Sequence, residues 1–235
     1  MKSSEFIEIL KNSKNSVFTF SQLARILGKK EEYAKVFINR LAEKELFRLE
    51  RNKYTLKGTN PFLIASNIIF PSYISFISAY SYYNLTTQLP RTFFVVSLKQ
   101  RKPISFDSNL IQFVKFEKFR FFGFKREIIE GKFVFVAEIE KAILDSLYLP
   151  RYCSISETFF ALKNAKLDLK KLFRYSKEMK SVAVIKRLGY LLEISGIDSS
   201  EIKTSFKNYS LLNPNLPKKG EKNEKWKLII NEVIE

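Results

Sequence analysis

Apolar residues recur at helical spacing in the first thirty positions of the chain. They predict a first helix over residues 3–11, whose apolar positions are Phe6, Ile7 and Leu10. Ser21 is expected to cap a second helix, and Gly28 is expected to end it. The apolar positions of this second helix are Leu23, Ala24, Ile26 and Leu27.

A third helix, predicted over residues 31–44, separates its polar positions from its apolar ones. Its apolar face follows the spacing i, i+3, i+4, i+7 and consists of Ala34, Phe37, Ile38 and Leu41. The opposite face carries Tyr33, Lys35, Val36, Asn39 and Arg40. Two strand-like runs follow at 46–49 and 54–56, around the polar turn 50–53. Three helices followed by a β-hairpin predict a winged helix-turn-helix.

The middle of the chain changes from helical to strand periodicity and back. Helices are predicted over 61–69 and 72–84, separated at Phe70-Pro71 because a residue before proline disfavours the helical conformation. Strands are predicted at 93–98, 104–106, 110–116, 121–128 and 132–136, with a tight turn at Glu130-Gly131. A helix over 138–149 then ends at Pro150.

The last part of the chain has mainly helical patterns. Helices are predicted near 155–164, 168–178 and 181–195, followed by a polar loop and a short strand at 226–230. The whole pattern predicts an α+β fold in three parts. These are a winged helix-turn-helix over 1–57, a mixed α/β domain over 58–150, and a helical C-terminal region with a terminal strand over 151–235.

Net charge points to a polyanionic partner. The 41 lysines and arginines exceed the 24 acidic residues, which gives a formal charge of +17. The three parts carry +6, +4 and +7, so a solvated lysine-rich surface stays an alternative for the last part. No apolar run reaches the roughly 18 residues of a spanning helix, and the amphipathic start is unlike a signal peptide. A cytoplasmic protein without a membrane partner is expected.

Composition also removes several kinds of catalytic and metal site. The chain has no histidine, which excludes Ser-His-Asp and Cys-His nucleophiles and histidine metal ligands. Its single cysteine, Cys153, excludes an intramolecular disulfide and a thiolate zinc site, and a buried structural role is expected for it. Carboxylate and lysine chemistry stays open, so composition alone does not exclude an enzyme. The expectation is a protein that is not an enzyme and needs no metal or cofactor.

The third helix and the hairpin supply the side chains that duplex DNA requires. Lysine and arginine contact phosphates, whereas asparagine and arginine also bond to base edges. The expected groove-facing residues are Lys29, Lys30, Tyr33, Lys35, Asn39 and Arg40. The expected wing residues are Arg48, Arg51, Asn52 and Lys53. Gln22 and Arg25 on the second helix are expected to reach phosphate.

Two other readings involve the rest of the chain. Asp107 followed by Glu130-Gly131-Lys132 has the residue order of a restriction-nuclease magnesium site, which makes a magnesium-dependent nuclease the alternative function. Five aromatic residues between 73 and 83, together with Trp226, could stack on bases. Their dense helical spacing favours packing instead. The five are Tyr73, Phe76, Tyr80, Tyr82 and Tyr83.

Four stretches resemble the AbiEi-type antitoxins of abortive-infection toxin-antitoxin systems, which are regulators of viral defence. They are residues 47–56 at the end of the winged helix, 60–65, 72–85, and Ala137 with Glu140-Lys141-Ala142-Ile143-Leu144-Asp145. The segment 223–231 around Trp226 also looks similar. The family usually has glycine before the hairpin and at the wing turn, where this sequence has Glu45 and Asn52, and this difference bears on the geometry of the wing.

The resemblance implies a DNA-binding repressor of its own promoter that acts as the antitoxin of a type IV system. The toxin would be a separate nucleotidyltransferase-like chain, opposed without a stable complex. A homodimer on the DNA is compatible with this function, and a general DNA-binding regulator without an antitoxin role is the further alternative.

Overall fold

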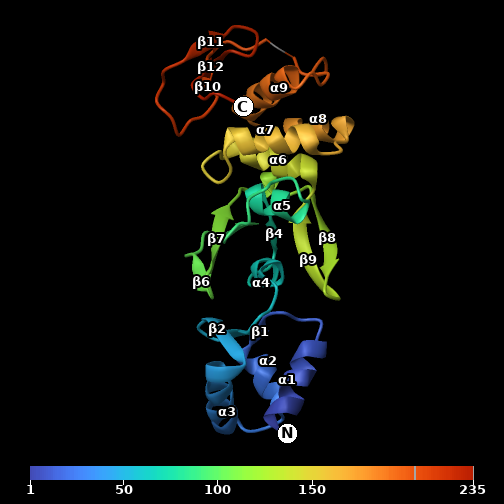
Figure 1. Ribbon diagram of the computed structural model, residues 1–235, viewed down its shortest axis with the longest axis vertical. Helices are drawn as coiled ribbons and strands as arrows, with labels where there is room; N and C mark the ends of the chain where they lie inside the picture. The colour runs from blue at the N-terminus through green and yellow to red at the C-terminus, as the bar shows by residue number, and fades with distance from the viewer. Residues whose placement is uncertain (204, 235) are drawn as a thin grey trace. The chain divides into compact units, whose positions relative to one another are not determined.

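The computed structural model describes residues 1–203 and 205–234 and has an α+β fold (Figure 1). The chain packs into two compact units. Unit 1 comprises Met1–Ile74, Arg91–Lys115 and Arg126–Val136, and unit 2 comprises Ser75–Pro90, Phe116–Lys125 and Ala137–Glu235. Because the chain passes between the units several times, neither coincides with one of the three predicted parts, and that division stays a prediction. Among the described residues, no helix is both long enough and apolar enough to span a membrane.

Unit 1 begins with three helices and a small sheet. The elements are α1 (Ser3–Asn12), β1 (Phe18–Thr19), α2 (Phe20–Leu27), α3 (Glu31–Lys44), β2 (Leu46–Glu50) and β3 (Lys53–Leu56). The strand order is β1-β3-β2, and both pairings are antiparallel. The predicted helices and hairpin are confirmed. Their apolar faces form one buried cluster, in which the rings of Phe6 and Phe37 meet edge to face with centroids 5.4 Å apart.

The second helix begins two residues earlier than predicted, since Thr19 rather than Ser21 is its N-cap. The Thr19 hydroxyl accepts from the Gln22 backbone N–H at 3.3 Å, and the Gln22 side-chain oxygen accepts from the Thr19 N–H at 2.7 Å. This reciprocal capping box satisfies two backbone donors that a helix start leaves without partners. The predicted end is confirmed, because Gly28 has a left-handed conformation with φ of 64°.

A six-stranded mixed sheet follows α4 (Pro61–Asn67). Its strands are β4 (Ser72–Ile74), β5 (Thr92–Ser97), β6 (Ile104–Phe106), β7 (Asn109–Lys115), β8 (Phe124–Ile129) and β9 (Lys132–Ala137). The order is β6-β7-β5-β4-β9-β8. Strands β5 and β7 pair in parallel, as do β4 and β9, whereas β4 with β5 and β6 with β7 are antiparallel. The five predicted strands are confirmed within a few residues at each end.

The predicted helix over 72–84 is wrong over its first four residues. Residues 72–74 form strand β4, which pairs with β5 on one side and with β9 on the other. Helix α5 begins only at Phe76 and ends at Tyr82. All three residues of β4 are buried, so periodicity could not distinguish this short central strand from a buried helical turn.

Unit 2 is mainly helical. Besides α5 it contains the 3-10 helix η1 (Lys118–Arg120), α6 (Ile139–Tyr148), α7 (Ile155–Asn164), α8 (Leu169–Glu178) and α9 (Val182–Ile194). A three-stranded sheet of order β10-β12-β11 follows, formed by β10 (Ser210–Leu211), β11 (Glu221–Asn223) and β12 (Leu228–Ile230). The helices predicted between 155 and 195 are confirmed. The predicted terminal strand is shorter, and β10 lies in the segment predicted to be loop.

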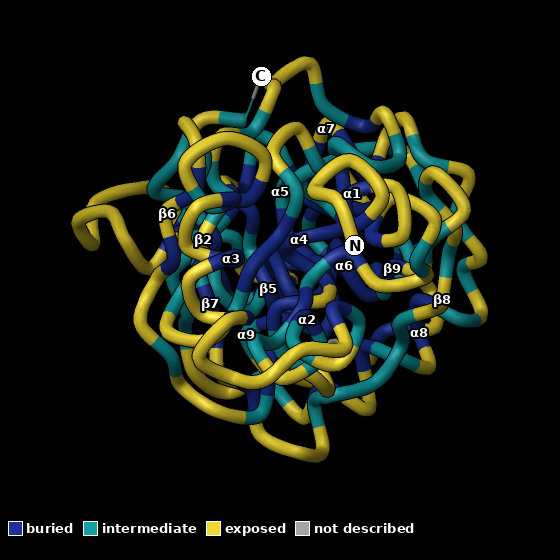
Figure 2. Tube along the Cα trace, turned by 90° about the horizontal axis from the view of Figure 1, so that it is seen from below, coloured by how far each residue is buried: buried dark blue, intermediate teal, exposed yellow. Residues whose placement is uncertain are grey.

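Burial alternates along the tube of the chain, as expected for amphipathic helices (Figure 2). In unit 2 the largest fully buried side chain is Trp226, whose indole N–H donates to Glu193 at 2.5 Å. Its ring lies against Gly189 of α9, where an added Cβ would stand 2.1 Å from a ring carbon. A glycine is therefore required at position 189, and the prediction that Trp226 serves packing is confirmed.

Candidate nucleic-acid interface

Helix α3 presents a polar face of the kind that the sequence predicts. Ala34, Phe37, Ile38 and Leu41 are buried, whereas the remaining positions from 31 to 40 are exposed. Glu31 and Glu32 lie in the first turn, where carboxylates favour the positive end of the helix dipole. Two apolar side chains are exposed on the polar face, Tyr33 at 53% and Val36 at 60%. The ring of Tyr33 stacks on that of Phe37, which holds it against the helix.

The polar side chains of this face have no partners within the described chain. None of the hydrogen bonds and ion pairs among the described residues involves the side chain of Lys35, Asn39 or Arg40. The same holds for Lys29 and Lys30, which are exposed in the turn between α2 and α3. These donors are therefore open to water or to a ligand.

The two predicted residues of α2 differ from each other. Arg25 is exposed, and no interaction among the described residues uses its guanidinium. Gln22 is half-buried, and its side-chain oxygen is occupied by the capping box with Thr19. Gln22 therefore stabilises the start of α2, a role that was not predicted from the sequence.

The hairpin forms although Glu45 and Asn52 stand where the resembled family usually has glycine. Asn52 at its tip has a φ of 68°, the left-handed conformation that glycine adopts most easily and asparagine next. Its carbonyl accepts from the Phe20 N–H at 3.0 Å, which ties the tip to the start of α2. Glu45 has a φ of −118°, so no glycine is needed before the hairpin. A tight turn therefore forms without either glycine, with Arg48, Arg51 and Asn52 exposed.

Lys53 is less available than predicted. Its ammonium donates to the Ile68 carbonyl at 2.5 Å and pairs with Glu50 at 2.9 Å. The side chain is half-buried, so two of its three donors already have partners inside unit 1. Arg48 and Arg51, rather than Lys53, are the free cations of the hairpin.

Glu50 belongs to an ion-pair cluster that sequence reasoning missed. Arg101 donates from one guanidinium nitrogen to both Glu50 oxygens, at 3.1 and 2.8 Å. Arg101 also lies over the Phe113 ring, 5.8 Å from its centroid. Two cations, Arg101 and Lys53, therefore pair with the Glu50 carboxylate of the hairpin. The basic run Lys99-Gln100-Arg101-Lys102 was visible in the sequence, but only the fold shows that its Arg101 pairs with Glu50.

The residues of the predicted magnesium site are not brought together. Asp107 lies in the turn between β6 and β7, whereas Glu130 and Gly131 form the turn between β8 and β9. These hairpins are at opposite edges of the six-stranded sheet. Lys132 donates to the Asn15 carbonyl at 3.1 Å, and Glu130 accepts from Asn60 at 3.3 Å. The described residues also contain no group of three or more carboxylate or thiol ligands suited to a metal.

The aromatic residues are largely packing residues, as interpreted from the sequence. Tyr73, Phe76 and Tyr80 are fully buried, and burial raises the pKa of the Tyr80 hydroxyl. Tyr82 and Tyr83 are half-buried, and the Tyr83 hydroxyl donates to the Ala137 carbonyl at 2.9 Å. None of these five rings offers an open stacking platform.

Helix α6, which carries part of the family resemblance, contains charged residues in the core of unit 2. Lys141 and Asp145, one turn apart, form a completely buried ion pair. Asp145 also accepts from the Ser75 hydroxyl at 2.8 Å, and the Lys141 ammonium lies over the rings of Phe116 and Phe122. Burial lowers the pKa of Lys141, and the Asp145 carboxylate opposes that shift. Nothing about this arrangement gives a ligand access to the pair.

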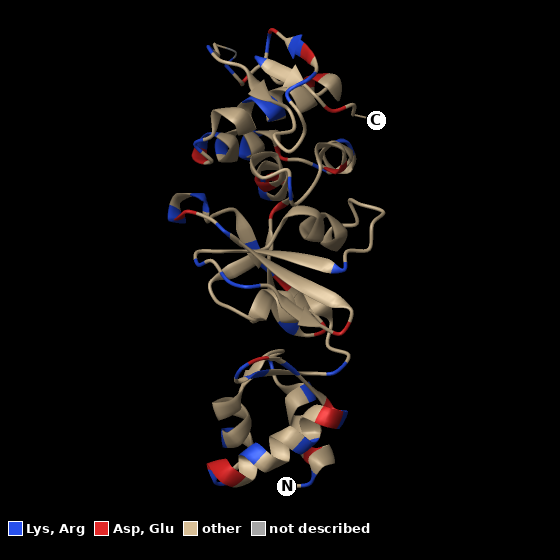
Figure 3. Ribbon diagram, turned by 90° about the vertical axis from the view of Figure 1, so that its left-hand side faces the viewer, with Lys and Arg blue, Asp and Glu red and all other residues tan. Residues whose placement is uncertain are grey.

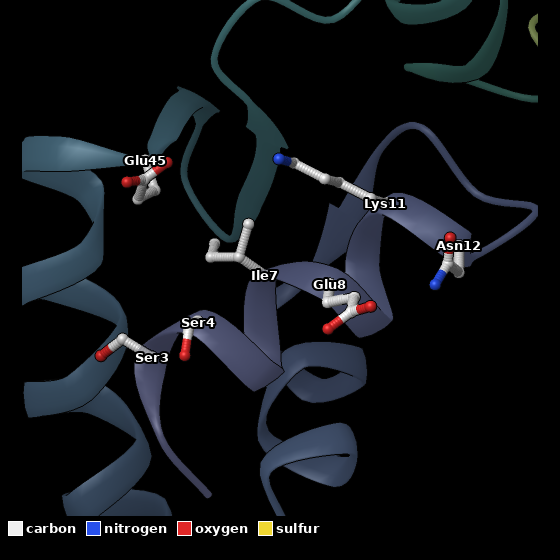
Figure 4. A pocket seen from close by; sticks show the side chains of 7 residues that line it. All are labelled: Ser3, Ser4, Ile7, Glu8, Lys11, Asn12 and Glu45. Carbon is white, nitrogen blue, oxygen red and sulfur yellow. The ribbon is translucent and has the colours of Figure 1, made fainter.

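Two further features carry no chemistry. Burial raises the pKa of the Cys153 thiol to about 12, so it is not a nucleophile, and its predicted structural role agrees with this environment. A recess of about 660 Å³ lies beside α1, where Ile7 and Lys11 line it together with Glu45 at the end of α3 (Figure 4). Most of its walls are exposed polar side chains, and no convergent set of donors lines it.

Lysines and arginines occur on elements of both units, as Figure 3 shows. The charge by itself therefore does not mark an interface. The exposed face of α3 combines cations with an amide, and these side chains have no partners among the described residues.

No protein-family model matches the chain, and no curated protein matches it in sequence. A solved structure has a similar fold, the crystal structure of the RV2827C protein from Mycobacterium tuberculosis. The similarity has a TM-score of 0.69 and covers 97% of this chain and 90% of that one, at 12% sequence identity. At this identity the similarity concerns the fold alone.

Proposed function

We propose that this protein is a DNA-binding transcriptional regulator whose residues 1–57 form a winged helix-turn-helix. The observation that carries the proposal is the exposed face of α3, on which Lys35, Asn39 and Arg40 have no partner in the described chain. An α-helix fits the major groove of duplex DNA, where such side chains bond to phosphates and base edges.

The segments around α3 support this function. Gly28 turns the chain sharply between α2 and α3, with Lys29 and Lys30 exposed beside the start of α3. The hairpin β2–β3 follows α3 directly and exposes Arg48, Arg51 and Asn52. In the proposed complex α3 enters the major groove and the hairpin contacts the adjacent backbone.

Binding of the full-length chain to the DNA upstream of its own gene tests the proposal. A Lys35→Ala/Arg40→Ala variant is expected to lose retention in a gel shift, whereas a Lys11→Ala/Lys14→Ala variant removes the same charge from the α1 region and should keep it. Unchanged binding by the α3 variant contradicts the groove assignment. Wild-type protein that gives no shift even at low salt contradicts the DNA-binding function.

The second part of the proposal is an antitoxin role of the AbiEi type, in which the protein represses its own promoter and counters a nucleotidyltransferase-like toxin from a separate gene. The resemblance over residues 47–56, 60–65 and 72–85, at Ala137 and over 140–145 supports it. The proposed protein is cytoplasmic, is not an enzyme and uses no cofactor. A neighbouring nucleotidyltransferase gene that inhibits growth when expressed alone should no longer do so when this protein is co-expressed. Failure to restore growth would contradict the antitoxin role and favour a general DNA-binding regulator.

The nuclease alternative is disfavoured by the sheet, because Asp107 and Glu130 lie at opposite edges of it. Magnesium-dependent nicking of a plasmid, lost in Glu130→Ala, would reverse this conclusion.

A further inference from the structure

The loop between β5 and β6, residues 98–103, is a second strongly basic surface of unit 1. It contains Lys99, Arg101 and Lys102 and no acidic residue. Lys99 and Lys102 are exposed, and none of the interactions among the described residues uses their ammonium groups. We call residues 98–103 the basic loop.

The basic loop has a defined shape because both of its ends are held. The Ser97 hydroxyl, which is buried, donates to the Lys99 carbonyl at 2.8 Å. Arg101 donates to both Glu50 oxygens and lies over Phe113. The positions of Lys99 and Lys102 on either side of Arg101 are therefore set by fixed neighbours.

The same contacts attach the basic loop to the hairpin of the proposed DNA-binding segment. Glu50 is the last residue of β2, and strands β2 and β6 are in contact. Since Lys53 also pairs with Glu50, the two cations and one carboxylate leave a net positive charge at this junction. A recess of about 340 Å³ lies here, lined by Lys53, Lys99 and Arg101 and bordered by Phe70, which is 81% exposed.

We infer that the basic loop is a second contact surface for duplex DNA, in which Lys99 and Lys102 bind backbone phosphates beside those bound by the hairpin. This inference rests on the proposed function. Phosphodiester oxygens are the chemistry that fits, because Lys99 and Lys102 offer point charges, whereas the amide of the loop, Gln100, donates to the Arg101 carbonyl at 3.4 Å. The Arg101–Glu50 pair positions the loop and is not itself the phosphate contact.

The salt dependence of binding tests this inference with the full-length protein. Fluorescence anisotropy is recorded with a labelled duplex from upstream of its gene and with an unrelated duplex of equal length. For Lys99→Ala/Lys102→Ala, the slope of log K against log salt should fall by about 1.8, since each phosphate contact contributes about 0.9. The loss should be equal on both duplexes, because phosphate contacts do not read sequence.

The control is Arg126→Ala on β8, at the opposite edge of the sheet from β6, which should leave the slope unchanged. An unchanged slope in the Lys99/Lys102 variant, with normal wild-type binding, overturns the inference while the proposed function stands. Loss of binding only to the corresponding single strand also overturns it and points instead to Phe70 as a stacking residue. A wild-type protein that binds neither duplex overturns the inference and the proposed function together.

Discussion

Helices α3 and α6 have similar patterns of apolar positions, but their charged side chains differ in burial. In α3 the cations between the apolar positions are exposed and have no partner in the described chain, whereas in α6 Lys141 and Asp145 are buried and pair with each other. Helices α5, α7, α8 and α9 pack against α6, and all of its residues from Glu140 to Leu147 are buried, whereas α3 buries only one face. An amphipathic pattern alone therefore does not tell whether a lysine is available to a ligand.

The largest expected effect on stability comes from a substitution that breaks the buried ion pair of Lys141 and Asp145. Lys141→Ala leaves the Asp145 carboxylate in the core without its cation, and we expect a loss of about 3–5 kcal/mol in the free energy of unfolding. Chemical denaturation monitored by circular dichroism measures it. Lys141→Met combined with Asp145→Leu should recover most of the stability, because it removes both charges. A free energy of unfolding of Lys141→Ala within about 1 kcal/mol of the wild-type value would contradict a buried ion pair at this position.

The two faces of α3 can be compared in the same way. Phe37→Ala removes a buried ring that meets Phe6, and a loss of about 3 kcal/mol is expected. Tyr33→Ala is the matched control from the exposed face and should cost about 0.5 kcal/mol or less. Equal losses in the two variants would mean that Tyr33 is part of the core.

Stability and DNA binding should separate on the exposed face. Lys35→Ala/Arg40→Ala should change the free energy of unfolding by no more than about 0.5 kcal/mol, because neither side chain has a partner among the residues that the structure describes. The same variant is expected to lose DNA retention. Parallel denaturation and gel-shift experiments decide this, and a strongly destabilised variant would invalidate the comparison with α6.

The smallest expected effect concerns a surface ion pair. Lys225 lies 2.7 Å from Glu193 and lowers the pKa of that carboxyl. A lowered carboxyl pKa contributes stability above the unfolded value of about 4.5 and loses it as pH falls through the folded pKa. Lys225→Ala should therefore reduce stability by under about 1 kcal/mol at pH 7 and by less at pH 3. A difference that grows on acidification contradicts the pair.

Several features of the candidate interface were predictable because they are local. The bounds of α3 and its exposed face follow from apolar spacing, and Gly28 follows from the preference of helix ends for a left-handed residue. The cap was misassigned because Thr19 and Ser21 are both good capping residues and only the Gln22 contact distinguishes them. The glycine that this chain lacks at the tip of the hairpin is not needed there, since Asn52 adopts the left-handed conformation.

Long-range features were not predictable from one sequence. The identity of β4 as a central strand, the separation of Asp107 from Glu130, and the link between Glu50 and Arg101 all depend on strand order in the six-stranded sheet or on packing against it. Fifty-one positions separate Glu50 from Arg101, so no local pattern contains the pair.

The sequence by itself determined the α+β class, the amphipathic helices, the hairpin after α3 and the absence of histidine chemistry, because each depends on composition or on residues a few positions apart. The tertiary structure alone decided which charged side chains are free. A lysine stays exposed, forms an internal ion pair or donates to a backbone carbonyl according to what the fold packs beside it, as Lys35, Lys141 and Lys53 illustrate in turn.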